Sequence, residues 1–130
     1  NDKPVEMSAK ITFIDDTGGF GFLCRNTNLG RYEFMIQPNG NWVIRRNSSY
    51  WWDPAVGYHI DILAQGTSPA ISPTENNMTA ICSGTTLSLA VNGEQIANLE
   101  DDLYPEGEIA LWFEPHTSAN LIGLSVKTPE

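Results

Sequence analysis

Residues 82–99 contain the pattern that most restricts how this 130-residue chain can fold. Apolar residues occupy every second position from Leu87 to Val91, which is typical of a strand with one buried face. Asn92-Gly93 follows directly, and this dipeptide tolerates the positive φ angles of a type I′ turn. We therefore predict a hairpin in which residues 94–99 fold back antiparallel on the strand that precedes the turn.

The same alternation recurs in short stretches along the chain, and turns rich in Gly, Asn and Pro separate them. The stretches are 5–14, 20–25, 32–36, 42–46, 58–64, 78–82, 108–114 and 121–126. We expect surface loops at 47–57 and 65–77, which are polar and punctuated by Gly and Pro. No stretch shows a sustained helical period of 3.6, so the sequence predicts an all-β fold, an antiparallel β-sandwich. Residues 1–130 are expected to form one domain, excised from or processed out of a longer protein.

The charge of the chain argues against several classes of partner. Seven Lys and Arg stand against 16 Asp and Glu, which gives a formal net charge of −9. This charge repels a phosphate backbone, so we predict no binding to nucleic acid. No apolar run approaches the ~20 residues that a membrane-spanning helix needs, so we predict no membrane insertion.

The two cysteines, Cys24 and Cys82, both lie within alternating apolar runs. Free thiols there would behave as small buried hydrophobic side chains. Paired, they would close a loop of nearly half the chain, and the loop-entropy description gives a stabilisation of ~4 kcal/mol. A disulfide would also place the chain in an oxidising compartment.

Several motifs together resemble one family. They are Gly-Phe-Gly-Phe-Leu-Cys-Arg at 19–25, Arg-Tyr-Glu-Phe-Met-Ile at 31–36, Asn-Gly-Asn-Trp at 39–42, the 82–93 segment and Gly-Glu-Ile-Ala-Leu at 107–111. In this order they resemble concanavalin A-like jelly rolls, and more closely the laminin-G-like and 3-keto-disaccharide hydrolase-like domains of bacterial extracytoplasmic proteins.

The resemblance implies a jelly-roll sandwich and an extracellular, cell-surface or periplasmic location. It also implies a disulfide between Cys24 and Cys82 on neighbouring strands. Related domains have further strands before the position of Val5. Either the chain has been trimmed there, or one sheet has an open edge through which a homodimer could form.

An aromatic cluster is the most suggestive functional feature. Tyr50, Trp51 and Trp52 lie in a polar segment, with Arg46 before them and Asp53 after them. Indole faces stack on sugar rings and the charged groups can hydrogen-bond to hydroxyls, so these five residues are the predicted ligand-binding site, for a glycan or a protein. The alternative is that the indoles cap the end of the core, since large aromatic side chains dominate burial.

We predict no catalytic residues and no metal site. Glycosidases of the resembled fold place carboxylates on one face of a strand, but Ala110 and Trp112 follow Glu108 where further carboxylates would be needed. No cofactor is expected, and calcium at the acidic turns 15–16 or 100–102 is the alternative. The favoured function is a non-catalytic glycan- or macromolecule-binding domain. The alternatives are a glycoside hydrolase-like enzyme and a structural or oligomerisation domain.

Overall fold

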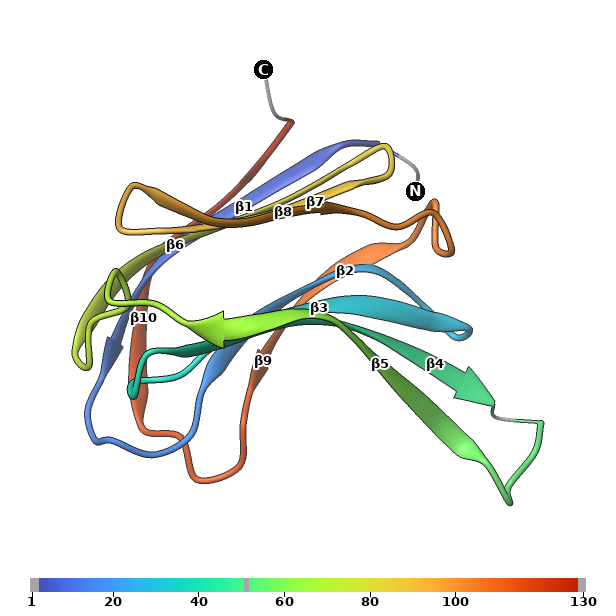
Figure 1. Cartoon of the computed structure of the whole chain (residues 1–130), viewed down its shortest axis with the longest axis horizontal. Helices are drawn as coiled ribbons and strands as arrows, with labels where there is room; N and C mark the ends of the chain where they lie inside the picture. Colours follow the sequence, from blue (N-terminus) through green and yellow to red (C-terminus); the bar gives the residue numbers. More distant parts are fainter. Residues whose placement is uncertain (1–2, 51, 129–130) are drawn as a thin grey trace.

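The computed structural model describes residues 3–50 and 52–128, and these fold into two antiparallel five-stranded sheets that face each other (Figure 1). The strand orders are β10-β1-β6-β7-β8 and β5-β4-β3-β2-β9. The strands are β1 (Val5–Phe13), β2 (Phe20–Thr27), β3 (Gly30–Ile36), β4 (Asn41–Tyr50), β5 (Gly57–Thr67), β6 (Glu75–Ser83), β7 (Thr86–Val91), β8 (Glu94–Glu100), β9 (Glu108–Phe113) and β10 (Ala119–Lys127). The predicted all-β sandwich is confirmed. This part of the chain includes no helix that is long and apolar enough to cross a membrane.

The alternating patterns place one core between the sheets. Every second residue of β1, β2, β3, β6 and β7 is buried and points inward, because side chains of a strand alternate between its two faces. The fully buried inward side chains include Met7, Ile11, Phe20, Phe22, Tyr32, Phe34, Met78, Leu87 and Leu89. The β7–β8 hairpin is confirmed, with Asn92 at φ 55° and Gly93 at φ 82°, as a type I′ turn requires.

The prediction of a loop from residue 47 was wrong. Strand β4 continues to Tyr50, and Asn47 and Ser48 pair with β3 on one side and with β5 on the other. The β4–β5 hairpin then extends beyond the other strands at one end of the sandwich (Figure 1). Polar residues suit this extension because little core lies beneath it, and backbone pairing with two neighbours holds the strand in place.

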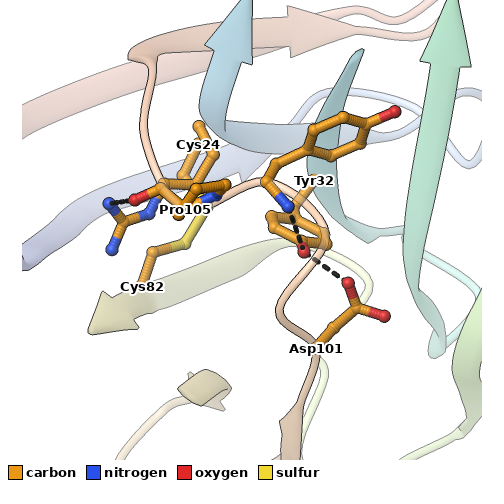
Figure 2. Close-up of a disulfide and its surroundings, with 7 residues drawn as sticks. Cys24, Tyr32, Cys82, Asp101 and Pro105 are labelled. Carbon is orange, nitrogen blue, oxygen red and sulfur yellow. Dashed lines mark hydrogen bonds between the residues drawn. A yellow bond between two sulfur atoms is a disulfide. The ribbon is translucent and has the colours of Figure 1, made fainter. Parts of the chain in front are cut away.

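Cys24 and Cys82 form a disulfide, and both residues are completely buried. Figure 2 shows the bridge beside the segment that carries Asp101 and Pro105. The pairing is confirmed, but its expected placement between neighbouring strands needs correction. Cys24 is on β2 and Cys82 on β6, so the bridge joins the two sheets across the core.

One side of the sandwich is open where β9 and β10 form the sheet edges. Leu111 and Phe113 are paired with buried core residues of β2, and Val126 is paired with Met7. These side chains, with Ile109 and Leu124, are nevertheless 37–48% exposed. The open edge considered from the sequence, and the homodimer that it could support, stay predictions.

Candidate functional site

The predicted aromatic site lies at the tip of the β4–β5 hairpin. Tyr50 and Trp52 contact each other edge to face, with ring centroids 5.3 Å apart. Trp52 is 57% exposed, so the indole does not cap the core. Trp51, the third aromatic residue of the prediction, lies outside the described residues. The hairpin therefore presents the Trp52 indole to solvent beside the partly buried ring of Tyr50.

The two charged residues of that prediction make contacts within the protein. Arg46 donates through Nη1 to Asp101 and through Nη2 to Asp61 at 3.0 Å. The Arg46 hydrogen bond, together with one from His59, lowers the pKa of the Asp61 carboxyl below its usual value. Asp53 accepts the backbone N–H of Ala55 through Oδ1, at 3.1 Å, and its carbonyl accepts that of Gly57. Arg46 thus ties the sheet to the β8–β9 connection, and Asp53 shapes the hairpin turn.

Tyr32 belongs to the same polar network at the margin of the core. Its hydroxyl donates to Asp101, as Figure 2 shows, and accepts the backbone N–H of Tyr104 at 3.1 Å. Burial, reinforced by the hydrogen bond to Asp101, raises the pKa of Tyr32 above its ordinary value. The phenol therefore stays neutral at physiological pH and fixes the β8–β9 connection against β3.

A second candidate site lies on the outer face, which we define as the side of sheet β5-β4-β3-β2-β9 turned away from the core. Directly paired residues of neighbouring strands share a face, and Glu33 of β3 is paired with Arg45 of β4, while Arg31 is paired with Asn47. Tyr32 between them points into the core, so these four polar side chains point outward. We call them the Glu33 cluster.

The carboxylate of Glu33 is the centre of this cluster and is only 1% exposed. Its Oε1 accepts a hydrogen bond from Nε of Arg45, and its Oε2 accepts one from Nε of Arg31 at 2.7 Å. The amide of Asn47 also donates to Oε2, at 3.3 Å. Such a carboxylate fixes the orientation of both guanidinium groups, because each is held by a charge-assisted hydrogen bond.

Trp112 extends the cluster toward β9. The guanidinium carbon of Arg45 lies 5.2 Å from the centre of the indole, a cation–π contact. Trp112 is paired with Gly21, whose missing side chain makes room for Met35: a Cβ at Gly21 would lie 2.3 Å from the Met35 sulfur. Met35 and Leu23 also belong to the outer face, yet both are buried. The larger polar and aromatic side chains of this face therefore cover them.

Two hollows flank the Glu33 cluster. One, of about 520 Å³, is lined by Arg45 together with Asn41, Ile62, Gln65 and Glu114, and we call it the Arg45 groove. The other, of about 460 Å³, is lined by Thr27, Asn28, Gly30, Arg31, Asn47 and Ser49, and we call it the Arg31 pocket. The outer face therefore offers two adjacent concave surfaces with oriented polar groups between them, as ligand sites do.

The sequence contains a pattern for this cluster that no motif predicted above includes. Arg31 and Glu33 are two residues apart on a strand whose other face is apolar, and Arg45 and Asn47 repeat this spacing on the next strand. Charged and amide side chains on the same face of two adjacent strands favour a polar site. Only the register between β3 and β4 shows that the two pairs lie opposite each other.

Glu108, the carboxylate weighed for hydrolysis, is exposed on β9. Among residues 3–50 and 52–128, no group of three or more His, Cys, Asp or Glu side chains is placed to hold a metal ion.

Comparisons with solved structures show β-sandwich folds similar to this one. No protein-family model matches the chain, and no curated protein matches it significantly. The solved structure of a carbohydrate-binding module, CBM66 from Bacillus subtilis, is similar over 97% of this chain and 76% of that one, with TM-score 0.76 and 11% identity. Sheep galectin-11 is similar over 95% of this chain and 90% of its own, with TM-score 0.68 and 9% identity.

A third similar structure is galectin LEC-6 of Caenorhabditis elegans, over 96% of this chain and 83% of that one, with TM-score 0.62 and 14% identity. At such low identity these likenesses establish the jelly-roll-like β-sandwich and nothing about the ligand of this chain.

Proposed function

We propose that this domain is a non-catalytic glycan-binding module and that it holds its ligand on the outer face. The observation that carries the proposal is the buried Glu33, which orients Arg31 and Arg45 between two hollows and beside an indole. Guanidinium groups donate hydrogen bonds to sugar oxygens, and Trp112 offers an aromatic surface to the apolar face of a sugar ring. The sandwiches similar to this chain include a carbohydrate-binding module and galectins, which favours a glycan as the ligand.

A non-catalytic role is supported by the residues of β9. Glu108, Ala110 and Trp112 follow one another along the outer face of this strand, so the closely spaced carboxylates of a glycosidase do not occur along it. A location outside the cytoplasm is supported by the buried disulfide, which is typical of proteins from oxidising compartments.

Replacing Trp112 by Ala should weaken glycan binding by about tenfold or more, since truncating a central aromatic residue commonly costs more than 1 kcal/mol of binding free energy. A glycan array would identify a ligand, and isothermal titration would measure its dissociation constant. Trp52→Ala is the matched control, because its indole is exposed on the hairpin tip. If Trp52→Ala abolishes binding and Trp112→Ala does not, the site is on the hairpin and the proposal for the outer face is wrong.

A second candidate function, self-association, is favoured by the open side along β9 and β10. Apolar side chains exposed at unpaired strand edges promote pairing with another chain. We expect light scattering coupled to size-exclusion chromatography to show a dimer whose fraction rises with protein concentration. The Leu111→Lys variant should be monomeric in the same measurement. Val56→Lys, at an exposed position in the β4–β5 turn, should leave the dimer intact. A wild-type protein that stays monomeric at high concentration would exclude this function.

A further inference from the structure

We propose that the preferred ligand is an acidic glycan, whose carboxylate sits in the Arg31 pocket while a neighbouring neutral sugar occupies the Arg45 groove. This inference rests on the proposed function and adds to it the chemical class and the orientation of the ligand. It follows from three properties of the outer face: the accessibility of Glu33, the charge of the Glu33 cluster and the different linings of the two hollows.

The first property is that Glu33 is almost inaccessible. With 1% of its surface exposed and both oxygens accepting hydrogen bonds, its carboxylate offers a ligand almost no acceptor. The guanidinium groups remain partly accessible, with 35% of the Arg31 side chain and 23% of the Arg45 side chain exposed. A ligand therefore meets N–H donors at the centre of the face, and donors select acceptors.

The second property is charge. Arg31 and Arg45 carry two positive charges against the one negative charge of Glu33, so the cluster is net positive on a domain of net charge −9. The described contact of Arg31 with Glu33 uses Nε, and no described side chain is hydrogen-bonded to its Nη atoms. A guanidinium edge formed by two N–H groups matches the two oxygens of a carboxylate.

The third property, the different linings of the two hollows, gives the orientation of the ligand. The lining of the Arg31 pocket contains hydroxyl and amide groups but no acidic side chain, so nothing in this lining repels an anion. The Arg45 groove includes the carboxylate of Glu114, which accepts a hydrogen bond from Gln37 at 3.2 Å. Glu114 would repel a ligand carboxylate but can accept hydrogen bonds from sugar hydroxyls, so the neutral unit belongs in the groove.

The test compares an oligosaccharide of alternating hexuronate and neutral sugar units with the same oligosaccharide after reduction of its carboxyl groups, both titrated against the full chain. We expect the acidic form to bind about tenfold or more tightly, because charge-assisted hydrogen bonds are roughly twice as strong as neutral ones. We also expect this advantage to shrink as sodium chloride is raised, since salt screens partly exposed charges.

Arg31→Gln should remove the preference for the acidic form. Lys10→Gln changes the net charge equally, but Lys10 belongs to β1 in the opposite sheet, where it forms an ion pair with Glu75. This variant should therefore keep the preference.

A preference that survives in Arg31→Gln would overturn the assignment to the Arg31 pocket. Equal affinity of the wild type for both forms would overturn the acidic ligand and leave the proposed function standing. If no glycan binds, both proposals fail. The wild-type comparison decides the ligand class even where a variant does not fold.

Discussion

Removing the Cys24–Cys82 disulfide should lower the free energy of unfolding by about 4 kcal/mol. The two cysteines are 58 residues apart, so the bridge strongly restricts the unfolded chain. It also joins β2 to β6 across the core, where both cysteines are completely buried. Since domains of this kind are typically stable by only about 5–15 kcal/mol, the loss would be a large share of the total.

The measurement is equilibrium unfolding in urea of the wild type and of the double variant Cys24→Ala/Cys82→Ala. The double variant avoids an unpaired buried thiol, and the small volume change keeps the packing loss low. Adding a reductant should destabilise the wild type and leave the double variant unchanged, which separates the bridge from the packing. A difference in unfolding free energy below about 1 kcal/mol between the wild type and the double variant would contradict this prediction. It would show that the unfolded chain is already compact without the bridge.

The architecture was predictable from the sequence because period-2 alternation and turn residues act locally. The β7–β8 hairpin illustrates this: Asn92-Gly93 specifies the turn, and the alternation up to Val91 specifies which face is buried. The extension of β4 to Tyr50 was not predictable in the same way. Asn47 and Ser48 have low strand propensity, and they are held in β4 by pairing with β3 and β5, which is a tertiary effect.

The candidate site on the outer face was harder to predict because it depends on register. The sequence shows Tyr50 and Trp52 as neighbours of charged residues, but it does not show that Arg46 is hydrogen-bonded to Asp61 and Asp101. Conversely, Trp112 is far in sequence from Arg45 and contacts it only because β9 joins the sheet beside β2. Clusters built from separate strands need the pairing of the whole sheet, which local patterns do not specify.

The Glu33 cluster leads to the second large prediction, in which Glu33→Gln lowers the free energy of unfolding by about 2–3 kcal/mol and abolishes glycan binding. A glutamine keeps the shape but removes the charge, and its amide N–H₂ would face the Nε–H of one arginine, donor against donor. The loss is smaller than for a fully buried ion pair because Arg31 and Arg45 are partly exposed and can turn toward water.

Glu108→Gln is the matched control, since it neutralises an exposed carboxylate in the same sheet. It should change the unfolding free energy by less than about 0.5 kcal/mol and leave glycan affinity near that of the wild type. Urea unfolding and isothermal titration of both variants give the two readouts separately. A Glu33→Gln protein that is destabilised but still binds would show that the cluster only stabilises the sheet. One that is stable but no longer binds would show that Glu33 acts mainly by orienting the two arginines toward the ligand.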